Sequence, residues 1–176
     1  MEETEVPLEK VNEDIEHHAH SAGVGWITWS ALLSAVLAVF AAVAALNSGH
    51  HANEAMMEQI KSSDKWAFFQ AKGIKASILE TRAQILKATG HESDVQEKLI
   101  EYASEQKELK AAAEEHEHES ATHFRSHEIF ATAVTLFQIA IAVTAISVLA
   151  RRRRFLFLAL GFGLFGTFFL VQGFWN

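Results

Sequence analysis

The sequence contains no cysteine and a single proline among its 176 residues. Without cysteine, the chain forms neither disulfide bonds nor thiolate metal sites. The one proline is Pro7, so the polar stretch 47–129 is free of proline and permits long helices. The sequence also lacks a phosphate-binding glycine loop and a basic nucleic-acid footprint. These absences argue against nucleotide-dependent chemistry and against a nucleic-acid partner.

Charged residues are missing from three apolar runs, which cover residues 24–46, 130–150 and 155–175. A helix needs about 20 apolar residues to cross the hydrocarbon core of a bilayer, and each run reaches that length. Trp26 and Trp29 lie near the start of the first run, where tryptophan favours the headgroup boundary. We therefore predict an all-α integral membrane protein with three transmembrane helices surrounded by membrane lipids.

The N-terminal segment, residues 1–23, is acidic and has Lys10 as its only lysine or arginine. A cleaved signal peptide would begin with basic residues and contain a shorter apolar stretch, so we expect the first run to remain as a membrane helix. His17, His18 and His20 could bind a metal, but a disordered polar lead-in is the simpler interpretation.

A turn of four arginines, Arg151, Arg152, Arg153 and Arg154, separates the second apolar run from the third. Guanidinium groups are costly among lipid tails, and short cationic loops stay on the cytoplasmic side of a membrane. The arginines therefore predict a tight cytoplasmic turn. This orientation places the N-terminus in the cytoplasm and residues 47–129 on the opposite side of the membrane.

The polar stretch 47–129 has the pattern of two helices joined by a turn. Potential helix breakers occur at residues 47–49, at Gly73 and around Gly90. Gly90 suits the end of a helix, and Ser93 followed by Gln96 matches a capping box at the start of the next. We predict a long antiparallel helical hairpin, a coiled-coil-like stalk, inserted between the first and second membrane helices with its turn near Gly90.

Heptad spacing predicts a packing seam on each arm of this hairpin. On the second arm the seam runs through Val95, Leu99, Tyr102, Gln106, Leu109, Ala113, His116, Ser120, His123 and His127. On the first arm it runs through Met56, Ile60, Ser63, Ala67, Gln70, Ile74, Ile78, Thr81 and Ile85. Pairing centred on Gly90 would place Met56 beside His127, with His51 about one turn away. The first arm is net basic and the second net acidic, which favours their pairing.

Three aromatic residues of the first arm, Trp66, Phe68 and Phe69, cannot all face one partner, because neighbouring helical positions diverge by about 100°. Self-association would cover those that the second arm leaves exposed. The candidate interaction residues are Trp66, Phe69, Gln70, Lys72 and Lys75. The alternative is that they complete the hairpin core.

Small and polar residues within the apolar runs predict close helix packing in the membrane. Ser30, Ser34 and Ala38 begin a small-residue row in the first run, and Gly163 and Gly166 belong to a glycine-rich face in the third. Gln138 in the second run could hydrogen-bond a neighbouring helix or line a conducting path, and the first role is the commoner one.

The histidines and glutamates near the end of the second arm are candidate metal ligands. His123 and His127 are one helical turn apart, and with His116 and Glu119 they could hold a divalent transition metal such as zinc, nickel, copper or cobalt. The alternatives are a solvated helix end, a seam that loosens when its imidazoles become charged, or a di-iron site built on Glu115 and His118. No other cofactor is expected.

One segment on the first arm carries a resemblance to a known family. Trp66, Phe69, Gln70, Ala71 and Lys72 form its core within residues 64–75, and residues 136–142 and the arginine turn accompany it. Together they resemble the bacterial three-span membrane proteins catalogued as domain of unknown function 4337. The resemblance implies a multi-pass protein of the bacterial inner membrane with a periplasmic hairpin, and it supplies no catalytic residues.

These features predict a non-enzymatic, self-associating membrane protein whose helical stalk serves assembly or partner docking. Its expected partners are further copies of the chain and another membrane or periplasmic protein. The alternative function is an oligomeric ion channel or metal-linked transporter, with a collar of histidine and glutamate at the membrane surface.

Overall fold

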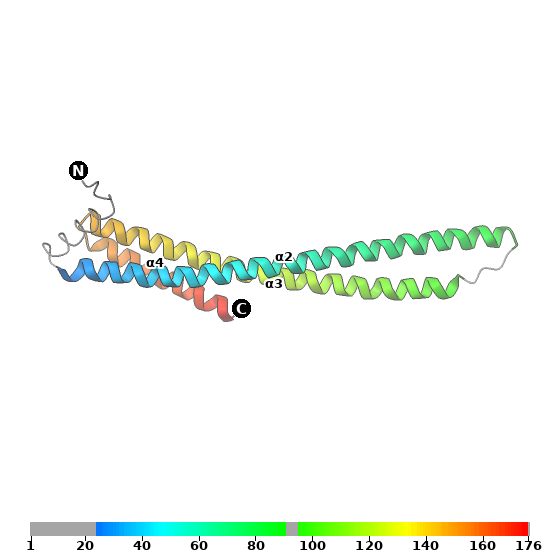
Figure 1. Cartoon of the computed structure of the whole chain (residues 1–176), viewed down its shortest axis with the longest axis horizontal. Helices are drawn as coiled ribbons and strands as arrows, with labels where there is room; N and C mark the ends of the chain where they lie inside the picture. Colours follow the sequence, from blue (N-terminus) through cyan, green and yellow to red (C-terminus); the bar gives the residue numbers. More distant parts are fainter. Residues whose placement is uncertain (1–23, 91–94, 176) are drawn as a thin grey trace, which may run out of the picture. The chain divides into compact units, whose positions relative to one another are not determined.

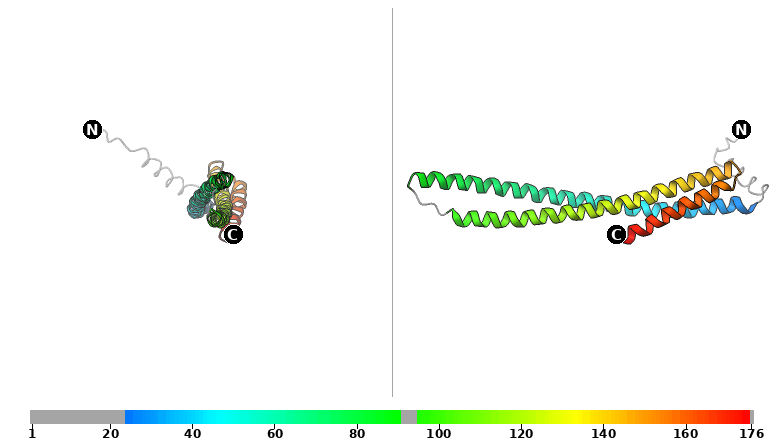
Figure 2. Two further views of the ribbon diagram at one scale, coloured as in Figure 1. Left: turned by 90° about the vertical axis from the view of Figure 1, so that its right-hand side faces the viewer. Right: turned by 180° about the vertical axis from the view of Figure 1, so that it is seen from behind.

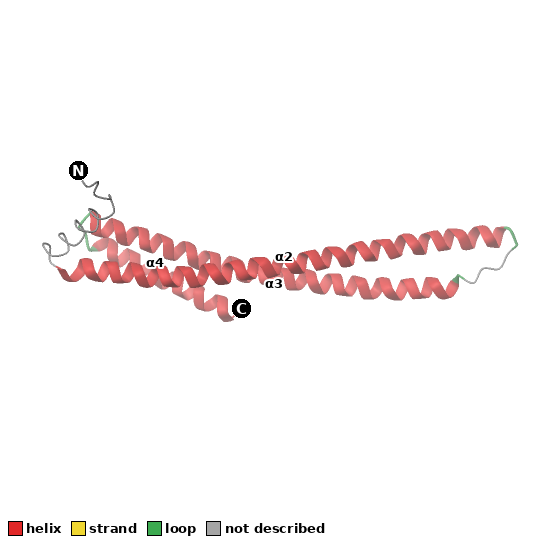
Figure 3. Cartoon of the chain, viewed as in Figure 1, coloured by secondary structure: helices red, strands yellow, loops and turns green. Residues whose placement is uncertain are grey.

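The structure is a computed structural model that describes residues 24–90 and 95–175. It contains α2 (Val24–Ala88), α3 (Gln96–Leu149) and α4 (Arg154–Trp175) (Figure 1). The described residues are helical or form the turns between helices, without a strand (Figure 3). All three helices are long and apolar enough to cross a membrane. The predicted all-helical class is therefore confirmed. The acidic N-terminal segment and Ser93 of the expected capping box lie outside the described residues.

The chain divides into two compact units. Of the described residues, the first unit contains 24–48 and 128–175, and the second contains 49–90 and 95–127. Both α2 and α3 contribute to each unit, whereas α4 belongs to the first alone.

The first unit packs three helices through residues spaced alternately three and four apart, the spacing that keeps one face of each helix toward its neighbours. Phe130 and Phe137 of α3 are fully buried at its centre. Leu37 and Ala44 of α2 and Leu170 of α4 complete the same core. Figure 2 shows the three helical segments of this unit lying side by side in its right-hand view.

Glycines on α4 let this helix approach the phenylalanine rings. A Cβ atom added at Gly166 would lie 2.8 Å from the Phe137 ring, and one added at Gly173 would lie 2.7 Å from the Phe130 ring. At Gly163 the nearest atom would be a methyl carbon of Leu37, at 2.9 Å. Larger residues at these positions would separate the helices.

The arginine residues form the turn between α3 and α4. Its backbone is closed by a bond from the Arg152 amide to the Ser147 carbonyl at 3.2 Å, and the Ser147 hydroxyl donates to the Arg152 carbonyl at 3.1 Å. Arg151 has a left-handed backbone with φ of 50°. Arg154 differs from the expectation, because it is the first residue of α4 instead of the last residue of the turn.

The second unit is an antiparallel pair made from the second half of α2 and the first half of α3. The Ser62 hydroxyl donates to the Ala113 carbonyl at 3.0 Å, and the Ser120 hydroxyl donates to the Ala55 carbonyl at 2.8 Å. Residue numbers therefore rise along one helix as they fall along the other. Bonds of this kind need backbones in close contact, which alanine and serine permit.

Residues 47–49 and Gly73 were expected as potential breaks, but α2 runs through both positions without interruption. The Asn47 side chain donates to the Val43 carbonyl at 2.8 Å, a contact that follows the helix instead of ending it. A glycine inside a helix costs only about 1 kcal/mol relative to alanine, which the packing of a long helix offsets.

The pairing register also differs from the expectation. His123 lies against His51, whereas pairing centred on Gly90 would place Met56 beside His127. The cause is the asymmetric connection: α2 continues to Ala88, but α3 begins only at Gln96. Gly90 itself has φ of +75°, as expected of a glycine that follows a helix.

Substitution of Gly166 by alanine tests the close packing in the first unit. The new methyl group would meet the Phe137 ring, so we expect Gly166→Ala to lower the free energy of unfolding by about 1–3 kcal/mol. Gly161→Ala is the matched control, because its methyl group would meet nothing within 4 Å. Titration of the detergent-solubilised protein with SDS, followed by tryptophan fluorescence, measures both. Equal stability of the two variants would contradict the proposed role of Gly166.

Candidate functional site

The packed seam of the second unit follows the prediction on α3 but not on α2. All ten predicted positions on α3 are buried or half-buried. On α2 the nine predicted positions, from Met56 to Ile85, are all exposed. The residues that pack are His51, Ala55, Glu58, Ser62, Lys65, Phe69, Lys72, Ala76, Leu79, Ala83 and Leu86. These residues have heptad spacing too, but small and charged side chains hide the pattern from a search for apolar residues.

The displaced seam leaves an apolar row exposed on α2. We call it the α2 row and define it as Met56, Ile60, Ser63, Ala67, Gln70, Ile74, Ile78, Thr81 and Ile85. No member carries a charge. The exposed fractions of Ile74 and Ile78 are both 62%. Side chains of this size, aligned along one helix face, form an exposed apolar surface.

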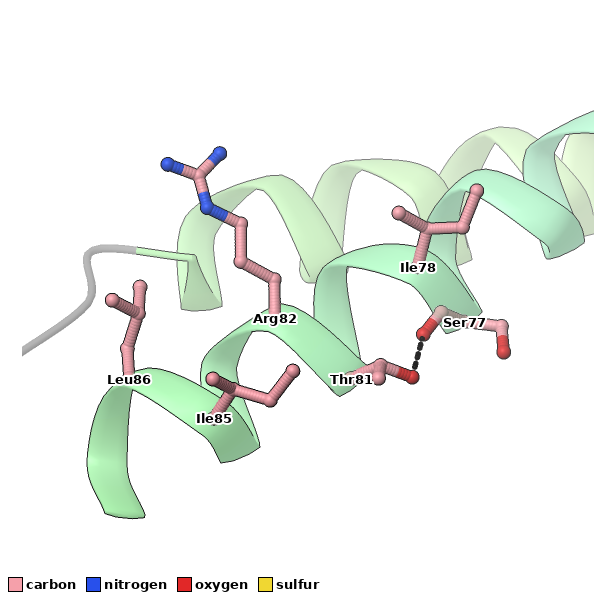
Figure 4. Close-up of a pocket in the computed structure, with 6 residues that line it drawn as sticks. All are labelled: Ser77, Ile78, Thr81, Arg82, Ile85 and Leu86. Carbon is pink, nitrogen blue, oxygen red and sulfur yellow. Dashed lines mark hydrogen bonds between the residues drawn. The ribbon is translucent and has the colours of Figure 1, made fainter. Parts of the chain in front are cut away.

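The α2 row continues into a shallow apolar hollow near the end of the helix (Figure 4). Ile78, Ile85 and Leu86 line it, and the Thr81 hydroxyl donates to the Ser77 carbonyl at 2.9 Å, so the hydroxyl is satisfied within the helix. Arg82 is the only charged residue in the lining. The face therefore offers methyl groups to a neighbour.

The five predicted interaction residues separate into two groups. Trp66 and Phe69 are half-buried and meet edge to face, with ring centroids 5.5 Å apart. Phe69 is part of the packed seam, and its carbonyl accepts a hydrogen bond from the Gln106 side chain at 3.3 Å. Gln70 and Lys75 are exposed and remain available to a partner.

Lys72, the fifth of these residues, is part of the seam. Its ammonium group forms an ion pair with Glu105 and lies 4.8 Å from the centre of the Tyr102 ring. The hydrogen bond that Lys72 donates to the Glu105 carboxylate raises the pKa of Lys72, and partial burial opposes this rise. Lys72 therefore stabilises the hairpin itself.

A second polar group on the seam centres on Glu58, a buried residue with 6% exposure. One carboxylate oxygen accepts from Lys61 and the other contacts His116 Nδ1, both at 2.7 Å. The hydrogen bond with Lys61 is the main cause that lowers the pKa of Glu58; burial opposes it and His116 assists. Glu119 lies 3.4 Å from His116, as expected for two predicted metal ligands on one helix.

Glu58, His116 and Glu119 bring three potential ligand atoms within 4.8 Å of one another. Sequence reasoning missed Glu58 because the expected register paired α3 with other residues. The only signal that could have found it is the heptad spacing of Ala55, Glu58 and Ser62. Since Lys61 and His116 already occupy both oxygens of Glu58, the geometry favours a closed ion-pair network.

A third polar group joins His51 of α2 to His123 of α3, with 3.1 Å between their Nδ1 atoms. Partial burial is the largest cause that lowers the pKa of His51, and the charges of His123, His50 and His127 act in the same direction. Glu54 opposes them. The structure thus places the predicted ligands in two places: His123 and His127 near His51, and His116 and Glu119 near Glu58.

In the first unit, Ser30 is buried and donates to the Trp26 carbonyl at 2.8 Å, and Ser34 is half-buried. Ala38 and Gln138 are exposed, so a packing role for either would need a second molecule. Gly163 and Gly166 are buried against Leu37 and Phe137. Arg151, Arg152, Arg153 and Arg154 are all exposed.

Comparison with known proteins matches residues 26–176 to the family described as Domain of unknown function (DUF4337). The chain belongs to this family. The match includes the three apolar helices and the hairpin, so family membership extends over both units. No curated protein matches the chain. No solved structure matches it.

The lowered pKa of Glu58 predicts the acid sensitivity of this family member. A carboxyl group whose pKa is lowered in the folded state stabilises the fold at pH values above its ordinary pKa of 4.5. This contribution is lost as the pH falls through the lowered pKa. Wild-type thermal stability should therefore fall as the pH drops below 4.5. Glu58→Gln should be less stable at neutral pH and show a smaller fall.

Circular dichroism of the full chain during heating would measure this difference. Glu114→Gln is the control, because Glu114 is exposed and lies 3.7 Å from Lys110. It should keep the wild-type profile. If Glu58→Gln also retained that profile, the buried ion pair would not be the source of the acid sensitivity.

Proposed function

We propose that this protein is a non-enzymatic, self-associating membrane protein whose helical hairpin serves assembly. The observation that carries the proposal is the α2 row, a charge-free and exposed row on a hairpin that is otherwise rich in charge. A monomeric hairpin would gain nothing from isoleucine at these positions. An assembly buries them.

The energy available from the α2 row is large enough to drive association. Ile60 and Ile85 have exposed fractions of 55% and 60%. Complete burial of an isoleucine side chain contributes about 1.5–3 kcal/mol, so four partly exposed isoleucines contribute several kcal/mol on each chain. Part of this gain offsets the entropy lost on association, which membrane anchoring has already reduced.

The chemistry of the α2 row favours a second copy of the chain as its partner. Its spacing is that of a coiled-coil seam with one extra step of four after Ile74, so two such rows can interlock. The positions along one border are Gln59, Trp66, Gly73, Ser77 and Gln84. Because this border is uncharged, two copies can approach along it without like-charge repulsion.

Membrane packing supports the same assembly. Gln138 is an exposed amide within an apolar run of α3, where lipid tails offer no hydrogen bond. Pairing with a polar group of a neighbouring chain would satisfy it, as buried amides commonly do between membrane helices. Ala38 presents a small side chain on the exposed side of α2 that would permit close approach.

Our proposed location is the inner membrane of a bacterium. The exposed guanidinium groups of Arg151, Arg152, Arg153 and Arg154 support a cytoplasmic turn, a cytoplasmic N-terminus and a periplasmic hairpin. Exposed Gln70 and Lys75 are then accessible to another membrane protein or to a periplasmic protein.

The alternative of an oligomeric channel or metal-linked transporter has weaker support. Glu58 and His116 contact each other in the seam between two helices of one chain, and His123 contacts His51 in the same seam. A collar that attracts ions would instead present such groups toward a shared axis. Apart from three threonines and one serine, Gln138 is the polar residue of the apolar run 130–150. An assembly could turn its side chain toward a pore.

A charge placed in the α2 row tests self-association. Ile74→Lys should weaken the assembly by at least about 10-fold, because each added ammonium group would lose its hydration and face a copy of itself. Ile100→Lys is a closely matched control: Ile100 is 64% exposed but lies on α3, outside the row. Analytical ultracentrifugation in detergent would give the assembly size. An equal response of the two variants would remove the α2 row from the interface.

Thiol labelling tests the orientation, and the natural absence of cysteine makes each introduced thiol unique. Ala88→Cys should react with a membrane-impermeant maleimide on intact spheroplasts. Arg152→Cys should react only after the membrane is permeabilised, because the arginine turn is proposed to face the cytoplasm. The reverse labelling pattern would show that the hairpin is cytoplasmic.

A further inference from the structure

Four histidines gather at one end of the second unit. The His51 and His123 rings have centroids 5.4 Å apart, and the His50 ring lies 5.6 Å from that of His51. His127 follows His123 by one helical turn and packs against Phe124 at 5.8 Å. Glu54 brings a negative charge that acts on His51. Elsewhere on the hairpin, Lys61 pairs with Glu58 and Lys72 pairs with Glu105.

The contact between His51 and His123 differs in kind from the ion pairs of the hairpin. Lys72 meets Glu105, and Lys61 meets Glu58, so each of these pairs joins opposite charges. His51 and His123 instead bring two like groups together, with their Nδ1 atoms 3.1 Å apart. Two N–H groups would repel at this distance, so at least one of the nitrogens presents a lone pair.

The distance between the two nitrogens fits a shared metal ion. Zinc binds imidazole nitrogen at about 2.0–2.1 Å, and two such ligands at a tetrahedral angle lie about 3.3 Å apart. The observed separation is 3.1 Å, and both rings are half-buried. A small shift of the side chains would admit the ion without movement of either helix.

We propose that His51 and His123 form a binding site for a divalent transition metal of the zinc class, which joins α2 to α3. Nitrogen ligands of this type suit zinc, cobalt, nickel and copper, and disfavour magnesium and calcium. His127 is the nearest further donor on the same helix, and water fills the remaining position. The metal ties the two helices at this end of the hairpin and thereby stabilises it.

This assignment differs from a metal site at Glu58, His116 and Glu119. There, both carboxylate oxygens of Glu58 already contact nitrogen atoms at 2.7 Å, a distance typical of charge-assisted hydrogen bonds. A metal at that position would have to displace Lys61 from a buried carboxylate. The histidine pair requires the loss of at most one shared proton.

Metal titration of the purified full chain tests the proposal, with cobalt(II) as the probe because its visible absorption reports ligand type and coordination number. The protein should carry a purification tag without histidine and be treated with chelator first. We expect one cobalt per chain, displaced by zinc, and a higher melting temperature of the loaded protein. Loss of His51 or His123, as His51→Gln or His123→Gln, should weaken binding by at least about 100-fold.

Two variants distinguish this site from its alternatives. His118→Gln removes an exposed histidine of α3 outside the seam and should leave the affinity unchanged. Glu119→Gln should also leave it unchanged, whereas it would abolish binding at the Glu58 cluster. Helix content by circular dichroism shows that each variant is folded. The proposal would be overturned if the wild-type chain did not bind cobalt stoichiometrically, or if His51→Gln and His123→Gln bound it with wild-type affinity. Loss of binding in Glu119→Gln would also overturn it.

The site lies within one chain and does not depend on the proposed self-association. Ile74→Lys should bind cobalt with wild-type affinity and with the same ratio of one ion per chain. A ratio of one ion per two chains that is lost in Ile74→Lys would show that the metal bridges protomers, and would overturn the intrachain site. The assembly itself would stand in that case.

Discussion

Close approach of helix backbones through small side chains is the constraint on which the structure depends. In the first unit, glycines of α4 face the rings of Phe130 and Phe137. In the second unit, hydroxyl groups of Ser62 and Ser120 reach carbonyl oxygens of the opposite helix. Such contacts rely on dispersion and hydrogen bonding more than on the burial of large side chains. The contacts of the first unit, whose helices are apolar enough to cross a membrane, suit a bilayer, where the hydrophobic effect does not drive helices together.

The same constraint explains why α2 has two distinct faces in the hairpin. Its packed face is built from small and charged residues such as Ala55, Glu58 and Lys72, which fit a narrow space and form ion pairs with α3. Most of the large aliphatic residues, with the exception of Leu79 and Leu86, therefore lie on another face. A hairpin with this division is stabilised internally by specific polar contacts, and its isoleucines remain exposed.

The sequence predicts the helical class and the α3 seam well because both depend on strong local signals. Leu99, Tyr102 and Leu109 are large enough to mark the seam of α3 by their spacing alone. On α2 the same reasoning selects Ile60 and Ile74, which are large and regularly spaced but exposed. Hydrophobic spacing finds the most apolar face of a helix, and on α2 this is not the face that packs against α3.

The candidate site could be predicted only as far as residues of one helix determine it. His116 and Glu119 are neighbours because they are three positions apart on α3. Their partner Glu58, and the partner His51 of His123, depend on the register between two helices. That register depends on a connection in which α2 ends at Ala88 and α3 begins at Gln96, and residue spacing within either helix does not give it.

Arg151 adopts an unfavourable backbone conformation in the turn between α3 and α4. Its φ of 50° lies in the left-handed region, which glycine adopts readily and which costs other residues roughly 1–2 kcal/mol of conformational energy. The amide and carbonyl of Arg152, both bonded to Ser147, hold the loop in this conformation. The turn therefore combines conformational strain with mutual repulsion among guanidinium groups. Any anion that gathers there, whether from dissolved salt or from a lipid headgroup, would relieve the repulsion and steady the loop.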